Sequence, residues 1–86
     1  MTYGQITQEI KEGLNVGGNL AAVYLKRFQE GFLGDKRSIT SFKARYNDEG
    51  DGVIFEYTIN DKTNTMSVEI QKSLWGYKPT KTQAQQ

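Results

Sequence analysis

The chain has 86 residues and a net charge of +1, and it contains neither cysteine nor histidine. This length holds one small domain, and the composition excludes disulfides, thiol catalysis, a Ser-His-Asp triad and the commonest transition-metal ligands. No apolar run approaches the roughly 20 residues that span a bilayer, and the first residues lack the pattern of a signal peptide. We therefore expect a cytoplasmic protein with no membrane partner.

Two helical patterns occupy the first third of the chain. Thr2 and Gln5 form a T-x-x-Q capping box, and an apolar stripe of spacing four predicts a helix over residues 3–12 that ends near Gly13. Asn19 is a suitable N-cap for a second helix. Its wide apolar stripe consists of Leu20, Ala21, Tyr24, Leu25, Phe28 and Phe32.

After residue 38 the apolar period changes to two. The segments SITSFKARY, VIFEYTI and TMSVEIQKS alternate in polarity and are separated by NDEGDG and NDKTN, which predicts an antiparallel meander. In the first strand the alternation places Ile39 on the polar face with Lys43 and Arg45. The apolar face requires cover, and the second helix can supply it. The predicted fold is therefore α+β, with two N-terminal helices on one face of a three-stranded antiparallel β-sheet (α-α-β-β-β).

The predicted domain covers residues 1–77. Residues 78–86 are polar, have no periodicity and are expected to form a mobile C-terminal tail.

The segment NDEGDGVIFEYT, residues 47–58, resembles the calcium-binding loop of the EF-hand family. Asn47, Glu49 and Asp51 match the first three ligand positions, and Gly52 matches the glycine of the sharp turn. Thr58 stands where that family has a bidentate glutamate, and the flanking patterns are strands. We therefore interpret the segment as a hairpin loop whose acids keep the tip solvated, with weak cation binding as the alternative, and we assign no metal ligands and no cofactor.

Charge is distributed unevenly along the chain. Residues 26–45 carry six basic and two acidic side chains, whereas residues 46–70 carry six acidic and one basic. A protein with this distribution can present surfaces of opposite sign to a partner. The predicted partner-binding residues are the loop acids and two aromatic residues near the end of the chain: Asp48, Glu49, Asp51, Trp75 and Tyr77.

The basic stretch supports an alternative, in which the protein binds nucleic acid. Its candidate phosphate contacts are Lys36, Arg37, Lys43 and Arg45. Glu56 and Glu69 share the predicted sheet face with two of these side chains and can neutralise them as cross-strand pairs. The near-neutral total charge is also unlike that of strongly basic nucleic-acid-binding domains.

The sequence favours binding over catalysis, because its carboxylates fall at a loop tip or on a solvated sheet face, where little shifts their pKa. We expect a non-enzymatic protein–protein interaction module, such as an inhibitor or adaptor. Phages and mobile elements often encode small domains of this kind. The first and third strands are the predicted edges of the sheet, and either could pair with a partner or form a homodimer.

Overall fold

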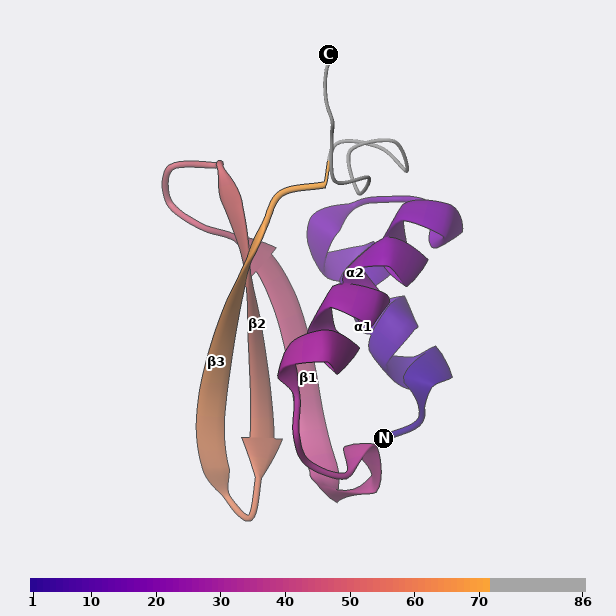
Figure 1. The fold of residues 1–86 in the computed structure, drawn as a ribbon, viewed down its shortest axis with the longest axis vertical. Helices are drawn as coiled ribbons and strands as arrows, with labels where there is room; N and C mark the ends of the chain where they lie inside the picture. Colours follow the sequence, from indigo (N-terminus) through magenta and orange to yellow (C-terminus); the bar gives the residue numbers. More distant parts are fainter. Residues whose placement is uncertain (72–86) are drawn as a thin grey trace.

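The computed structural model describes residues 1–71. Along the chain, the elements are α1 (Tyr3–Leu14), α2 (Gly18–Gly31), a 3₁₀ turn η1 (Lys36–Ser38), β1 (Ile39–Tyr46), β2 (Gly52–Ile59) and β3 (Lys62–Glu69). The strands form one antiparallel sheet in the order β1-β2-β3. Both helices pack on one side of this sheet, which confirms the predicted α-α-β-β-β fold (Figure 1).

The start of α1 follows the predicted capping box. The Gln5 amide donates to the Thr2 hydroxyl at 3.1 Å, and the Thr2 amide donates to the Gln5 side chain at 2.8 Å. The helix continues past the predicted end at Gly13 and stops at Leu14, with Asn15 in the left-handed conformation. Asn15 caps the helix because this residue type, like glycine, adopts that conformation readily.

The second helix begins earlier than predicted. Gly17 has an extended backbone and is the N-cap, so Asn19 lies inside α2 and provides no side-chain cap. Residues 17–19 are exposed, so water can satisfy the free amides at the start of the helix.

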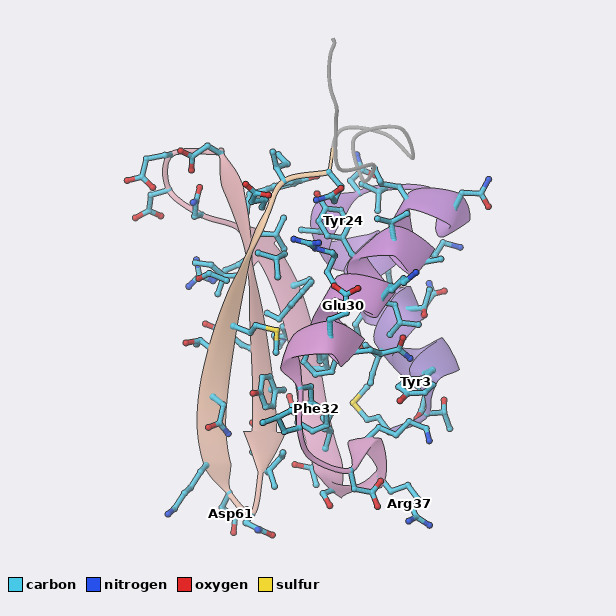
Figure 2. All side chains as sticks on the ribbon, in the orientation of Figure 1. Tyr3, Tyr24, Glu30, Phe32, Arg37 and Asp61 are labelled. Carbon is cyan, nitrogen blue, oxygen red and sulfur yellow. The ribbon has the colours of Figure 1, made fainter. Side chains whose placement is uncertain are left out.

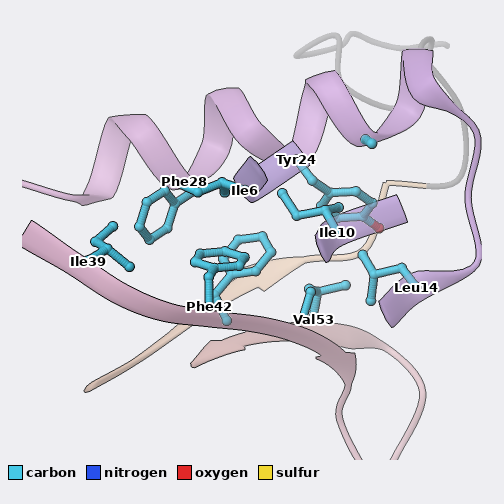
Figure 3. Close-up of a cluster of buried hydrophobic side chains, with 11 residues drawn as sticks. Ile6, Ile10, Leu14, Tyr24, Phe28, Ile39, Phe42 and Val53 are labelled. Carbon is cyan, nitrogen blue, oxygen red and sulfur yellow. The ribbon is translucent and has the colours of Figure 1, made fainter. Parts of the chain in front are cut away.

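The core lies between the helices and the sheet (Figure 3). Phe28 of α2 is fully buried and meets Phe42 of β1 edge to face at 5.0 Å and Phe55 of β2 at 5.8 Å. Such aromatic pairs stabilise a fold by about 0.5–1.5 kcal/mol each beyond the area that they bury. The helix stripe therefore covers the apolar sheet face, as its spacing predicts.

A β-bulge changes the face on which Ile39 lies. Strict alternation placed Ile39 with the polar residues, but its side chain is only 2% exposed. The register shifts between Ile39 and Ser41, and the extra residue turns Ile39 toward the core. The prediction for Ile39 was wrong because alternation cannot locate a bulge.

Candidate functional site

The acidic loop is the tip of the β1–β2 hairpin. The Asn47 side chain donates to the Asp51 carboxylate at 2.9 Å and accepts from the Asp51 amide at 3.1 Å. Gly50 has a φ of 75°, and its amide donates to the Asn47 carbonyl at 3.0 Å. The asparagine therefore closes the turn, and the side chains of Asp48 and Glu49 are exposed around it.

This geometry differs from that of an EF-hand loop. Asn47 and Asp51 bond to each other, and the loop joins two strands, whereas an EF-hand loop joins two helices. Across residues 1–71, no three potential ligand side chains gather closely enough to hold a metal ion. The loop is the hairpin connection that the flanking strand patterns predict.

Trp75 and Tyr77, the two aromatic residues predicted to contact a partner, lie outside the described residues. The predicted domain limit at residue 77 and the predicted tail over residues 78–86 also lie outside them. Of the five predicted partner-binding residues, the structure therefore describes only the three loop acids.

The structure divides the four basic candidates between two places. Lys36 and Arg37 belong to η1, at the end of the sheet opposite the acidic loop, where Figure 2 shows Arg37. Lys36 places its ammonium 4.6 Å from the centre of the Tyr3 ring, and Arg37 pairs with Asp35 at 2.8 Å. Hydrogen bonds from Arg37 lower the pKa of the Asp35 carboxyl to about 2.

Lys43 and Arg45 project from β1 on the sheet face that carries no helix. Lys43 lies opposite Glu56 of β2, and Arg45 reaches the same carboxylate at 3.4 Å. The cross-strand neutralisation by Glu56 that the sequence predicts is therefore present for Arg45. The four bases form two pairs of residues, and both arginines face a carboxylate, so they do not make one continuous basic surface.

The outer edge of β1 is closed by α1. A Cβ atom on Gly13 would overlap the Ala44 carbonyl oxygen and lie 3.0 Å from its carbonyl carbon, so the helix touches the strand backbone at this point. At the end of the strand, the Tyr46 hydroxyl donates to the Leu14 carbonyl at 2.7 Å. At its beginning, the Met1 nitrogen donates to the Ile39 carbonyl at 2.9 Å. The N-terminal residue and α1 together thus flank β1 at both of its ends.

The outer edge of β3 has no such cover within residues 1–71. The strand is last in the sheet order, and it pairs with β2 without a register shift. Asn60 and Asp61 form a two-residue turn with φ values of 52° and 63°, at the tip that Figure 2 labels with Asp61. Such a turn makes Ile59 and Lys62 a hydrogen-bonded pair and fixes which backbone groups of β3 face β2.

Because this turn fixes which alternate residues of β3 bond to β2, it also identifies the residues whose backbone groups point outward. From Lys62 onward, alternate residues bond to β2, and the residues between them direct their N–H and C=O groups outward. The four outward residues are Thr63, Thr65, Ser67 and Glu69. Charged side chains occur only at the two ends of the strand, and no proline or bulge interrupts it. A natural edge strand usually carries at least one of these protective features in its centre.

The helix-facing side chains of β3 are only partly covered. Met66 packs against Gly31 at the end of α2, yet Met66 and Val68 are only half-buried, unlike Val53 and Phe55 of the central strand. Among residues 1–71, the edge of β3 therefore combines backbone groups that have no partner with apolar side chains that could be buried further. Sequence reasoning predicted two candidate edges. It could not detect that Gly13 allows α1 to close the other edge.

A shallow hollow lies between α1 and β1. It is lined by Glu9, Glu12, Gly13, Lys43 and Ala44 and has a volume of about 240 Å³. This volume is below the roughly 300–1,000 Å³ of typical small-molecule sites, and charges of both signs line the hollow. It offers no enclosed space in which a reaction could be shielded from water.

Comparisons of the chain with protein-family models, curated proteins and solved structures gave no match. In the described part of the chain, no helix has both the length and the apolar character needed to cross a membrane.

Proposed function

We propose that the protein is a small non-enzymatic module that binds another protein, as an inhibitor or adaptor does, by accepting a strand at the outer edge of β3. The observation that carries the proposal is the contrast between the two edges of the sheet. The edge of β1 is closed by α1 at Gly13, whereas β3 is eight residues long and unprotected in its centre. Strand addition supplies affinity through main-chain hydrogen bonds, and side-chain contacts add specificity.

The acidic loop contributes to the choice of partner. Gly52 pairs with Glu69, so the hairpin tip that carries Asp48, Glu49 and Asp51 lies at the end of the sheet where β3 ends. Lys62 stands at the opposite end of the strand. A strand laid along β3 would therefore meet carboxylates at one end and an ammonium at the other. This polarity favours an incoming strand with a basic residue at the acidic end.

A proline on the free edge tests this proposal. The Thr65 amide points away from β2, so Thr65→Pro removes a donor that only an added strand would use. Thr65→Val is the matched control, because it keeps the amide. The tagged full chain and both variants are used to capture proteins from a lysate of the source cells, with and without nuclease.

We expect the wild type and Thr65→Val to retain one discrete protein after nuclease treatment, and Thr65→Pro to lose it while its melting temperature stays close to that of the wild type. Retention of the same protein by a folded Thr65→Pro would contradict the proposal. Captured material that disappears with nuclease, and that the double variant Lys43→Ala/Arg45→Ala fails to capture, would establish nucleic-acid binding instead.

A further inference from the structure

We propose that the strand accepted by β3 is the β3 strand of a second copy of this chain, so that two molecules form one continuous six-stranded sheet. This inference rests on the proposed use of the β3 edge and names its occupant. An unprotected edge strand pairs most readily with its own copies, and monomeric proteins avoid this with central charges, prolines or bulges. The segment from Thr63 to Val68 has none of these features.

The geometry of β3 restricts how two copies can pair. Antiparallel pairing about a two-fold axis brings the outward backbone groups of both strands together. Odd-numbered residues of one copy must therefore lie opposite odd-numbered residues of the other, and even-numbered residues opposite even-numbered ones. The middle of the strand falls between Thr65 and Met66. An axis through one of these two residues therefore pairs nearly the whole strand, and an axis elsewhere leaves more of it unpaired.

Charge decides between these two axes. An axis through Thr65 brings Asp61, in the turn just before β3, next to Glu69 of the other copy, and it does so twice in the dimer. Like charges brought together in this way oppose strand pairing. An axis through Met66 avoids this arrangement, because Glu69 then lies opposite Thr63 and Lys62 lies opposite Ile70. Either axis brings each Lys62 to the acidic end of the other copy, because the two strands run antiparallel.

In the register centred on Met66, the side chains that the two β3 strands bring together are also compatible on both faces of the sheet. On the open face, Thr65 lies opposite Ser67, a hydroxyl pair of the kind found across antiparallel strands. On the helix-facing side, the two Met66 side chains meet at the axis, where each is only half-buried in a single copy. Four hydrogen-bonded residue pairs would form, giving about eight main-chain hydrogen bonds between the copies.

The first test is the oligomeric state of the full chain by sedimentation equilibrium, from micromolar to millimolar concentration. We expect a reversible monomer–dimer equilibrium in the wild type and in Thr65→Val. Thr65→Pro removes one main-chain donor from each copy, so its dissociation constant should rise at least about tenfold. A wild-type chain that remains monomeric at every concentration would overturn the inference.

The second test fixes the register. The chain has no cysteine, so a single introduced cysteine reports only on its own symmetry-related copy. In the proposed register, the two Met66 positions form a non-hydrogen-bonded pair with Cα atoms about 4.5 Å apart, within the range that a disulfide bridges. Met66→Cys should therefore cross-link on mild oxidation. The control Asn64→Cys should not, because its two copies would be about 13 Å apart.

Two outcomes separate this inference from the proposed function. A monomeric chain whose captured protein is still lost in Thr65→Pro would overturn the dimer and leave strand addition to a different protein intact. A dimer that forms equally well in Thr65→Pro would show that β3 is not the dimer contact, which overturns this inference, whereas strand addition to a different protein is overturned only when Thr65→Pro retains the captured protein. Faster cross-linking of Thr65→Cys than of Met66→Cys would overturn the register.

Discussion

At the scale of single residues, Tyr24 holds α2 to the end of the sheet. Its side chain is 1% exposed, and its hydroxyl accepts from the Gln71 amide at 2.7 Å and donates to the Gln71 carbonyl at 3.3 Å. Gln71 follows β3, so this contact joins segments 47 positions apart in the chain. A buried hydroxyl with both bonds made adds to stability, whereas a buried backbone group without a partner costs free energy.

Removal of this hydroxyl has two expected effects. Tyr24→Phe removes the partner that the Gln71 amide and carbonyl have within residues 1–71, so the free energy of unfolding at neutral pH should fall by about 1–3 kcal/mol. Burial raises the pKa of Tyr24 above 10.0, and the bond to Gln71 opposes this shift only in part. The folded state therefore holds the Tyr24 proton more tightly than the unfolded state. The contribution of Tyr24 to the free energy of unfolding is fully present below pH 10.0 and is lost as the pH rises through the raised pKa of the folded state.

Denaturant unfolding at neutral pH and above pH 10.0 checks both effects. The stability of Tyr24→Phe should fall less steeply with alkaline pH than that of the wild type. Tyr3→Phe is the control, because the Tyr3 side chain is 41% exposed. Equal alkaline slopes for the wild type and Tyr24→Phe would contradict the role of the hydroxyl.

At the scale of elements, the contact between α1 and β1 closes one edge of the sheet, so that β3 provides the open edge within residues 1–71. Gly13 lies inside α1, where glycine ordinarily costs about 1 kcal/mol relative to alanine. It lies at the position where the helix touches the Ala44 backbone. The local cost is offset by the close approach, which only a residue without a Cβ atom permits.

Two alanine substitutions in α1 should therefore change the stability of the protein in opposite directions. At Gly4, a Cβ atom meets only the Thr2 hydroxyl at 3.7 Å, so Gly4→Ala should stabilise the protein by up to about 1 kcal/mol. At Gly13, the Cβ atom overlaps the Ala44 carbonyl, so Gly13→Ala should destabilise it by about 1–3 kcal/mol. Thermal unfolding of both variants measures the difference. A stabilised Gly13→Ala would show that the edge of β1 is not held closed at this point.

Most elements were predictable because their signals are local. The capping box at Thr2, the stripe that contains Phe28 and the alternation around Phe55 each depend on neighbours in the sequence. The burial of Ile39 and the close contact of Gly13 were not predictable, since they depend on register and on a segment more than 20 residues away. Gly13 resembles a helix stop in the sequence, yet it is a point of contact between elements.

At the scale of the whole molecule, the charge segments of the sequence do not become separate charged faces. Lys43 and Arg45 from the basic segment share the open sheet face with Glu56 and Glu69 from the acidic segment, and Arg45 contacts Glu56. Folding brings the two segments together because β1 pairs with β2. Within residues 1–71, a concentration of charge remains at the acidic hairpin tip, which the sequence predicted as a solvated loop.

The sequence predicted the kind of candidate site, an edge strand of the sheet, but not which of the two edge strands it is. The sequence indicated that an edge strand of a three-stranded sheet could bind a partner, and it identified two such edges. The choice between them depends on where α1 lies, which follows from packing around Gly13 and Tyr46 and not from any pattern in β3. Once the turn at Asn60 is known, the outward groups of β3 follow from alternation alone.

The most direct measurement of the central claim is amide hydrogen exchange along β3 as a function of protein concentration. In the dilute protein, the amides of Asn64 and Met66 should be protected by β2, while those of Thr65 and Ser67 exchange rapidly. Raising the concentration should protect Thr65 and Ser67 as well, because a second strand then binds the free edge. Protection of Thr65 and Ser67 in the monomer would mean that the edge is already occupied and would contradict the claim. If both amides stayed unprotected at every concentration, a second copy would not be the strand that β3 accepts.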